Sequence, residues 1–335
     1  MKAFVTGATG FVGSHLVDAL LERGDDVTSL VRSPAKAQRV FTARKPRLFP
    51  GSLNDPSALR TACKGVDVVF HLAGVTAARD RTQFLEVNES GTRAVVEAAR
   101  DVAPNLERFV QVSSLAAAGP AQRGHPLTED APPHPISDYG VSKLASEEVV
   151  KASGLPWTIL RPPAVYGPRD VELRRVFSFA RFGIRVVFGD GGQELSLIHV
   201  TDLINGMIRA ALGTGPGQTY FTCHSEVVTS KQFVSEVNAA VQELRKGKPV
   251  AASKSRFALG IPEWFARPAL ATTGFLAKLV GKPSVLSTDK VDEFYADAWT
   301  CSPAALERDA GWKADIPIAA GLRDTARWYR QQGLL

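Results

Sequence analysis

Short apolar runs alternate with amphipathic stretches through the first half of the chain. The runs at 2–6, 26–31, 67–71, 108–113 and 157–161 are rich in Val, Ile, Leu and Phe, which is typical of strands buried on both faces. The stretches at 15–23 and 88–100, and the one that starts near residue 139, have helical patterns instead. Alternation of this kind predicts an α/β fold with a doubly wound parallel sheet. From about Val171 the elements become shorter and less regular.

Three glycines follow the first apolar run and precede the first helical stretch. Gly7 permits a tight turn, Gly10 lets a pyrophosphate approach the backbone, and Gly13 allows the helix to pack closely on the sheet. The start of that helix would offer free N–H groups and a positive dipole end to phosphates. The spacing is G-x-x-G-x-x-G, not the G-x-G-x-x-G of the commonest dehydrogenases. We therefore expect a dinucleotide-binding Rossmann domain over residues 1–170, with contributions from about 190–215, and a smaller substrate-binding region and lid over 171–335.

The end of the second strand carries information about the cofactor. An NAD site usually ends this strand with a carboxylate for the ribose 2′-hydroxyl, whereas a nearby arginine suits the 2′-phosphate of NADP. Val31 stands where the acid would be, and Arg32 follows it. We predict a preference for NADP, with NAD and a solvent-facing Arg32 as the alternatives.

Tyr139 and Lys143 lie one helical turn apart, so both would project from the same face of a helix. A positive charge beside a phenol favours the phenolate and would lower the tyrosine pKa toward neutrality. Such a pair could move a proton to or from the oxygen of a carbonyl or alcohol. By itself the pattern is weak, since two exposed helix residues would look the same.

Composition narrows the classes of function. Apolar residues make up 44% of the 335 residues and charged residues 22%, as in an ordinary globular enzyme. The net charge of +6 is spread without a polybasic block, which argues against nucleic-acid binding and suits an anionic ligand. Cys63, Cys223 and Cys301 are too far apart in the sequence for metal-ligand spacing and fit a reducing compartment, so we expect no metal. Without a signal peptide or a run of about 20 apolar residues, the expected location is cytoplasmic.

Taken in order, these and five further motifs resemble the extended short-chain dehydrogenase/reductases, within the NAD(P)-dependent epimerase/dehydratase superfamily. The resemblance covers most of the chain. The motifs are Thr6–Gly13, His71–Gly74, Val87–Thr92, Val112–Ser114, Tyr139–Lys143, Arg161–Pro168 and Ile198–Leu203. One departure is Gly51-Ser52-Leu53, where the family commonly has Gly-Asp-Leu, so Ser52 would have to contact the adenine.

The resemblance implies a role for each motif. Tyr139 would be the acid/base, Lys143 would hold the nicotinamide ribose, and Ser114 would orient the substrate oxygen, although Ser114 could instead cap a backbone group. Asn88 would act either in catalysis or as a structural tie. The implied cofactor-binding residues are Gly7, Thr9, Gly10, Phe11, Val12, Arg32, Ser52, Leu53, Leu72, Ala73, Gly74, Val112, Ser113, Tyr139, Lys143, Pro162, Ala164 and Val165. As substrate contacts we expect Thr76, Ser114, Ala116, Tyr166 and Arg174.

Several positions speak against a nucleotide-sugar substrate. Relatives that act on such sugars typically have a tyrosine at the position of Ala118, an asparagine at that of Ala164, and Arg-Asp where this chain has Leu195-Ser196. Their loss would leave a buried diphosphate poorly paired, unless arginines such as Arg174 compensate.

The stretch from residue 257 to 285 is apolar and resembles the substrate-covering region of 3β-hydroxysteroid dehydrogenase-type and dihydroflavonol-reductase-like relatives. It could be a lid, a peripheral membrane contact or an ordinary core helix.

The resulting hypothesis is an oxidoreductase that interconverts a ketone or conjugated carbonyl and an alcohol on a lipophilic or polycyclic small molecule. A nucleotide-sugar epimerase or dehydratase is the main alternative, and a non-catalytic NADP-binding redox sensor is a third. A homodimer would be common for the family, but no residue in the sequence fixes one.

Overall fold

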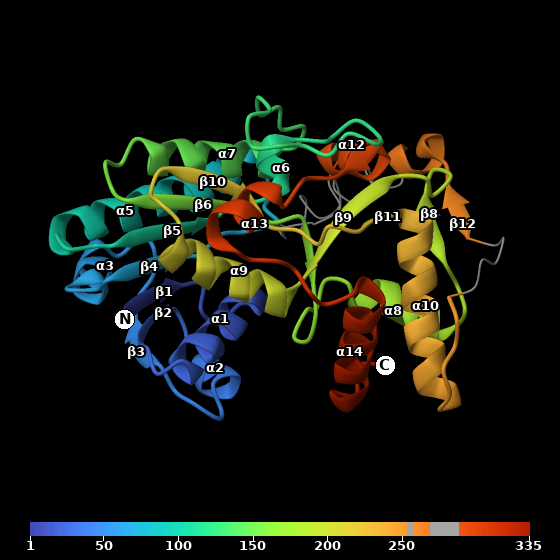
Figure 1. Ribbon diagram of the computed structural model, residues 1–335, viewed down its shortest axis with the longest axis horizontal. Helices are drawn as coiled ribbons and strands as arrows, with labels where there is room; N and C mark the ends of the chain where they lie inside the picture. Colours follow the sequence, from blue (N-terminus) through green and yellow to red (C-terminus); the bar gives the residue numbers. More distant parts are fainter. Residues whose placement is uncertain (253–257, 269–287) are drawn as a thin grey trace.

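Seven parallel strands form the central sheet of the computed structural model, which describes residues 1–252, 258–268 and 288–335 (Figure 1). The order β3-β2-β1-β4-β5-β6-β10 reverses direction at β1, and ligands of such sheets bind at the carboxyl ends of the strands near this point. The doubly wound Rossmann fold predicted from the sequence is confirmed. The strands are β1 (Lys2–Thr6), β2 (Asp26–Val31), β3 (Arg47–Pro50), β4 (Val68–His71), β5 (Arg108–Val112), β6 (Trp157–Arg161) and β10 (Gln218–Phe221).

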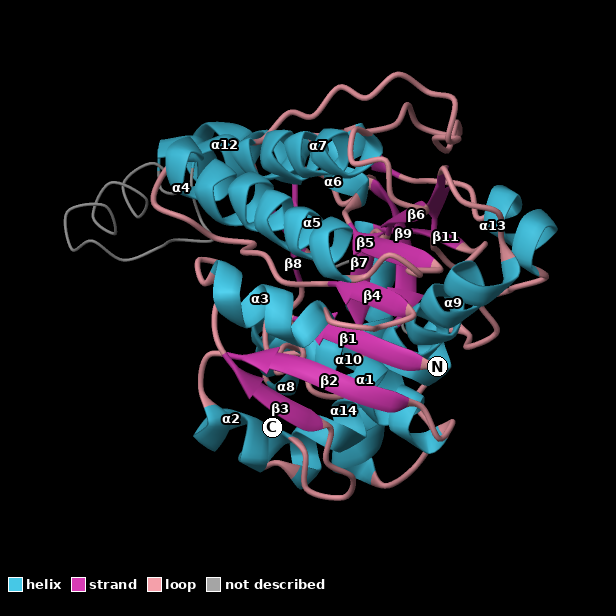
Figure 2. Ribbon diagram, turned by 90° about the vertical axis from the view of Figure 1, so that its left-hand side faces the viewer, coloured by secondary structure: helices cyan, strands magenta, loops and turns pink. Residues whose placement is uncertain are grey.

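Two layers of helices cover the sheet, as Figure 2 shows. Because both faces are covered, the central strands are apolar on both sides: Val5 packs toward α1 and α9, whereas Phe4 packs toward α3 and α5. One layer contains α1 (Phe11–Glu22), α2 (Pro34–Val40), α9 (Val200–Gly213) and α13 (Ala304–Ala310); the other contains α3 (Pro56–Cys63), α5 (Gly91–Val102) and α7 (Asp138–Lys151).

The helix expected over 88–100 is interrupted at its start. Residues Glu86–Ser90 form a π-helical turn, η1, between α4 (Arg81–Leu85) and α5. Such bulges are often found at functional sites. A second difference concerns β10, because this strand of the nucleotide-binding sheet lies beyond the predicted contributions from 1–170 and 190–215.

The remaining elements form a smaller region at the right of Figure 1. Its core contains the buried rings of Tyr166, Phe177 and Tyr329. Its strands are β7 (Ala164–Tyr166), β8 (Val186–Phe188), β9 (Glu194–His199), β11 (Val227–Thr229), β12 (Leu259–Ile261) and β13 (Ala298–Trp299), and its helices are α8 (Arg174–Arg181), α10 (Ser230–Lys246), α12 (Thr288–Tyr295) and α14 (Ile318–Gln331).

Most of the stretch predicted as lid, membrane contact or core helix lies outside the described residues. Its described part, 258–268, contains β12 and a helical segment at 263–268, where Trp264 and Phe265 are exposed. Within the residues described, no helix is both long and apolar enough to cross a membrane.

A buried carboxylate joins α7 to two strands of the sheet. Glu147 of α7 is fully buried and accepts bonds from Arg161 at the end of β6, at 2.9 Å from Nε and 2.6 Å from an Nη atom. It also accepts a 2.5 Å bond from the hydroxyl of Ser113, directly after β5. Removing one partner of such a pair leaves an unpaired buried charge, which is far costlier than removing both.

We therefore expect Glu147→Leu to lower the free energy of unfolding by about 3 kcal/mol or more, and Glu147→Leu with Arg161→Met to recover much of that loss. Urea unfolding of the single and double variants measures this coupling. The exposed pair Arg60–Asp101, at 2.8 Å, is the control, since Asp101→Asn should cost less than about 1 kcal/mol. Losses that simply add in the double variant would contradict the coupling.

Candidate active site

The glycine turn after β1 is packed too tightly for a side chain at Gly7 or Gly13. Gly7 has a φ of +71°, and a Cβ there would lie 2.7 Å from the backbone nitrogen of Ala73. At Gly13 a Cβ would lie 2.2 Å from the Gly7 carbonyl oxygen. The turn therefore rests directly on the segment after β4, which brings two predicted cofactor motifs together.

Helix α1 begins at this turn with free N–H groups. Its N-cap is Gly10, which has no side chain to bond them, and the first turn carries no acidic residue. Thr9 and Gly10 sit in the turn, and Phe11 and Val12 open the helix. A helix start of this kind favours a phosphate by both its N–H groups and its dipole.

A buried histidine fixes the segment that follows β4. His71 lies between the hydroxyls of Thr6, at 2.7 Å, and Thr92, at 2.9 Å. Burial and the nearby charge of Lys143 lower the pKa of His71 to about 3, so the ring stays neutral. The Thr6 hydroxyl also accepts a bond from the Ala73 backbone, which places Leu72, Ala73 and Gly74 beside the glycine turn.

Asn88 acts as a tie between loops. Its amide group bonds both backbone groups of Val75, at 2.8 and 3.1 Å, and donates to the Ser142 hydroxyl at 2.9 Å. Ser142 in turn donates to the carbonyl oxygen of Tyr139. Of the two roles expected for Asn88, these contacts support the structural one.

The two candidate catalytic hydroxyls meet at the start of α7. Ser114 hydrogen-bonds with Tyr139, and it also caps the short helix α6 (Leu115–Ala118) by accepting from the Ala116 backbone at 3.1 Å. The close approach of α6 to α7 depends on Gly140, where a Cβ would lie 2.3 Å from the Ala116 carbonyl oxygen. Tyr139 is half-buried against the ring of Phe84.

The sequence predicts that the pKa of Tyr139 is lowered toward neutrality, and this prediction is wrong, because the pKa is raised. Burial raises the pKa of Tyr139 to about 12, although the bond with Ser114 opposes the change, and Glu293 and Glu172 raise it further. Lys143 is not among the groups that act on this pKa, and its Nζ donates to the Val112 carbonyl oxygen at 2.7 Å. Burial also lowers the pKa of Lys143 to about 8, with Glu147 acting in the opposite direction. Desolvation outweighs the charge that the sequence argument relied on.

Other predicted cofactor residues lie just after strands of the central sheet or on β7. Ser113 follows β5, but its hydroxyl is committed to Glu147. Pro162 is buried after β6, while Ala164 is exposed and Val165 half-buried on β7. Leu53 packs on Gly91 at the start of α5.

At the outer end of the sheet, Ser52 accepts a bond from the Asn54 backbone at 3.3 Å. Arg32 is exposed at the end of β2, with no ion pair among the described residues. The hydroxyl of the next residue, Ser33, caps α2.

The predicted substrate contacts divide into two groups. Thr76 is exposed and donates to Glu172 at 3.2 Å, and Ala116 lies on the short helix beside Tyr139. Arg174 is exposed at the start of α8. Tyr166 is not at the site: it is fully buried against α14, with its ring 5.4 Å from that of His199.

The sequence did not predict two contacts that join α1 to the segment after β7. His15 of α1 bonds the Pro168 carbonyl at 2.8 Å, and Asp18 pairs with Arg169 at 2.7 Å. Arg169 has a φ of +71°, which is uncommon for a residue with a side chain. The sequence also gave no sign of Glu172 and Glu293. Their charges raise the pKa of Tyr139 through space, although both residues are distant from it in the chain.

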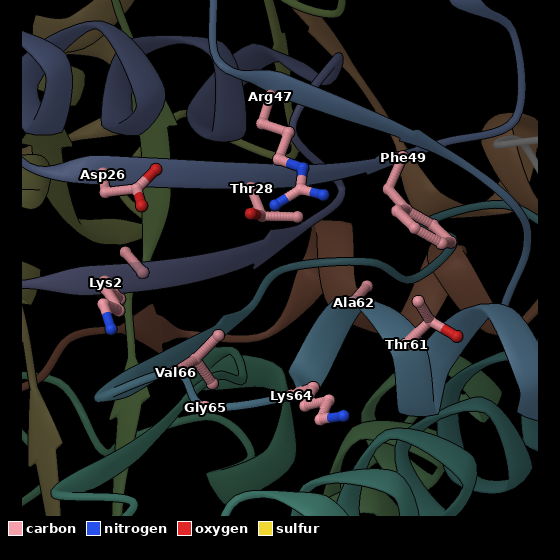
Figure 3. Close-up of a pocket in the computed structure, with 11 residues that line it drawn as sticks. Lys2, Asp26, Thr28, Arg47, Phe49, Thr61, Ala62, Lys64, Gly65 and Val66 are labelled. Atoms are coloured by element: carbon pink, nitrogen blue, oxygen red, sulfur yellow. The ribbon is translucent and has the colours of Figure 1, made fainter.

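A separate hollow of about 300 Å³ lies at the amino ends of β1 and β2, as Figure 3 shows. Lys2, Asp26 and Arg47 line it, and it contains none of the predicted site residues. The carboxyl ends of the strands, where the motifs converge, are at the opposite edge of the sheet. Among the described residues, no cluster of His, Cys, Asp and Glu could hold a metal ion.

A family model described as the NAD dependent epimerase/dehydratase family matches residues 3–220. The chain belongs to this family. Over its full length it is 31% identical to a ceramide reductase of Caulobacter vibrioides, covering 99% of this chain and 95% of that one. It is 29% identical to a 2-alkyl-3-oxoalkanoate reductase of Stenotrophomonas maltophilia, covering 96% and 98%. A 3-beta-hydroxysteroid dehydrogenase of Mycolicibacterium neoaurum is also similar, at 29% identity over 71% and 70%, in agreement with the extended short-chain dehydrogenase/reductase branch.

Solved structures share the fold. The crystal structure of gox2253 has a TM-score of 0.80 at 25% identity and covers 100% of this chain and 99% of that one. A UDP-glucose 4-epimerase of Thermotoga maritima, solved with UDP-glucose, has a TM-score of 0.76 at 21% identity and covers 99% of both chains. The family and the reductases and dehydrogenases among the relatives identify the protein as an NAD(P)-dependent oxidoreductase.

The chain's own residues fit a dinucleotide. The turn at Gly7 and Gly10 leaves the N–H groups of α1 free for a pyrophosphate, and Lys143 lies within the buried site between β5 and α7. A nicotinamide supplies or accepts a hydride when it is bound. Tyr139 and Ser114 can hold an oxygen between two hydroxyls, and Tyr139 can give that oxygen a proton.

The lowered pKa of Lys143 predicts a pH dependence of stability. Between about pH 8 and the unfolded value of 10.5, the unfolded state holds a proton that the folded state has released, so stability rises with pH. From pH 7 to 9 we expect the wild type to gain about 1 kcal/mol relative to Lys143→Met, measured by urea unfolding. Lys36→Met, at an exposed lysine, controls for loss of a positive charge. A constant difference at both pH values would refute the shift.

Proposed function

We propose that this protein reduces a ketone or conjugated carbonyl on a lipophilic small molecule, with Tyr139 as the proton donor and NADPH as the preferred cofactor. The pairing of the Tyr139 and Ser114 hydroxyls carries the proposal. Because the pKa of Tyr139 is about 12, the phenol is protonated at neutral pH, which is the form that can protonate a developing alkoxide.

Each residue then has one task. Ser114 donates to the substrate oxygen and orients it, and Tyr139 gives it a proton. Lys143, anchored on the Val112 carbonyl, holds the nicotinamide ribose. Asn88 keeps the loop after β4 and the start of α7 at a fixed spacing. Preorganised hydroxyls of this kind stabilise charge only as it develops on the oxygen.

Two observations support a lipophilic substrate. The relatives that match along almost the whole chain are named for reduction of ceramide and of 2-alkyl-3-oxoalkanoates. In addition, Ala118 is buried, and Leu195 packs against the apolar core of the C-terminal region. Neither residue offers a polar group to a diphosphate.

The second candidate, a nucleotide-sugar epimerase or dehydratase, is favoured by the structural neighbours that were solved with UDP-sugars. Exposed Arg174 and Arg175 at the start of α8 could bind a diphosphate. Stable binding of a UDP-sugar in calorimetry would promote this function over the first. The presence of both Tyr139 and Lys143 argues against a purely sensory role.

Tyr139→Phe removes the proposed proton donor but keeps the ring that packs on Phe84. We expect turnover of a ketone substrate to fall by about 10² or more while cofactor affinity stays nearly unchanged. Steady-state kinetics and a cofactor titration measure the two effects.

Tyr166→Phe is the matched control, because that hydroxyl is buried 3.5 Å from the Ile318 carbonyl and away from the site. It should keep most of its activity. A Tyr139→Phe enzyme with more than about a tenth of wild-type turnover would exclude the assignment.

The NADP preference rests on Arg32, which is exposed at the end of β2 where no carboxylate stands. A 2′-phosphate would find a guanidinium there, whereas a 2′-hydroxyl would find no acceptor.

Arg32→Ala should therefore weaken NADPH binding by about tenfold or more and leave NADH binding almost unchanged. Fluorescence titration with both cofactors measures the ratio, and Arg39→Ala on α2 is the control for an exposed cation nearby. Equal losses for the two cofactors would show that Arg32 does not contact the phosphate.

A further inference from the structure

Most of the exposed large apolar side chains among the described residues fall in two stretches of the chain. Nine large hydrophobic residues among those described are exposed, and seven of them fall within 171–184 and 259–265. The pairing of β12 with β8 brings the two stretches together, with the Leu259 backbone bonded to that of Arg185 at 2.7 Å. The seven are Val171, Phe179, Phe182, Ile184, Leu259, Trp264 and Phe265, of which Phe182 is 74% exposed and Trp264 77%.

A cationic hollow lies directly beside Phe182. It has a volume of about 810 Å³ and forms where α8 and α10 end. Figure 1 shows both helices in the right-hand part of the molecule. Bonds from Gln242 to the Ala180 carbonyl and from Arg245 to the Arg181 carbonyl hold the two helix ends together. Its charged lining residues are Arg181, Arg185, Arg245 and Lys246.

The acidic residues that the structure describes do not neutralise these four cations. In the part of the chain that the structure describes, none of them forms an ion pair, and Glu243 of α10 is occupied by Arg323 at 2.8 Å. Cations in the last turns of α8 and α10 complement the helix dipoles. The dipoles do not account for an exposed phenylalanine between them.

We propose that this surface docks on the face of an anionic lipid bilayer. We call it the α8–α10 surface and define it as Phe179, Arg181, Phe182, Ile184, Arg185, Arg245, Lys246 and Lys248. Aromatic and aliphatic side chains enter the headgroup region, while the surrounding cations approach lipid phosphates. A two-fold dimer through the same surface would instead set uncompensated cations against their own copies, so a second copy fits poorly.

The same region leads to the active site. Glu172, two residues before α8, raises the pKa of Tyr139 and accepts from Thr76, so α8 begins at the site. An eight-residue helix spans about 12 Å. The α8–α10 surface therefore lies about one short helix from Glu172, whose charge acts on Tyr139, and this would let a lipophilic substrate enter from the bilayer. This last step rests on the proposed function, whereas the docking does not.

Vesicle co-sedimentation of the full chain without substrate tests the docking. We expect binding to vesicles that are about one third phosphatidylglycerol, little binding to pure phosphatidylcholine, and loss of binding at high salt. The double variant Arg181→Glu with Phe182→Ser should bind the anionic vesicles at least about tenfold more weakly.

The matched control is Arg209→Glu with Leu212→Ser, an exposed cation and an exposed leucine on α9, and it should bind like the wild type. Thermal melts verify that both variants are folded. Equal loss of vesicle binding in the α8 variant and in this control would overturn the proposal. A wild-type protein that does not bind anionic vesicles would also overturn it. A wild-type dimer in ultracentrifugation that the first variant alone dissociates, without vesicle binding, would assign the surface to a second copy instead. Tyr139→Phe should bind vesicles normally, so failure of the proposed reaction stays distinguishable from failure of docking.

Discussion

The buried carboxylate of Glu147 fixes the position of α7 relative to the central sheet. Glu147 has no access to water and bonds Arg161 and Ser113, so it ties α7 to the ends of β5 and β6. Lys143 lies one turn earlier on the same helix and Tyr139 one turn before that. The Glu147–Arg161 pair therefore fixes the helix that carries Tyr139 and Lys143. An unpaired charge in this position would be expensive enough to enforce the geometry.

Burial then decides the protonation states. His71 remains neutral, the Tyr139 phenol keeps its proton, and Lys143 becomes easier to deprotonate, all because charged forms lose water in this part of the molecule. Hydrogen bonds orient these three side chains: His71 bonds Thr6, Tyr139 bonds Ser114, and Lys143 donates to the Val112 carbonyl. Burial therefore keeps the Tyr139 phenol protonated at neutral pH.

The sequence predicted the fold class well because its signals are local. Apolar runs, the glycines at 7, 10 and 13, and the spacing of Tyr139 and Lys143 each depend on neighbours in the chain. The tyrosine pKa could not be predicted that way, since it depends on desolvation and on the carboxylates of Glu172 and Glu293, which are distant in sequence. Tyr166 was expected at the substrate for a similar reason: its motif places it after a strand, but only packing against α14 shows that it is buried. The strand β10 was missed because its residues, Gln-Thr-Tyr-Phe, do not form an apolar run like that of the equally short β4.

That late strand has a consequence for how the protein is made. β10 pairs with β6 along residues 218–221, after the chain has already passed through β7, α8, β8 and β9. Until residue 221 emerges from the ribosome, β6 is an unprotected edge that could pair with other chains. The two regions are thus interleaved in synthesis, and a fragment ended at residue 170 would carry a sheet with an open, aggregation-prone margin.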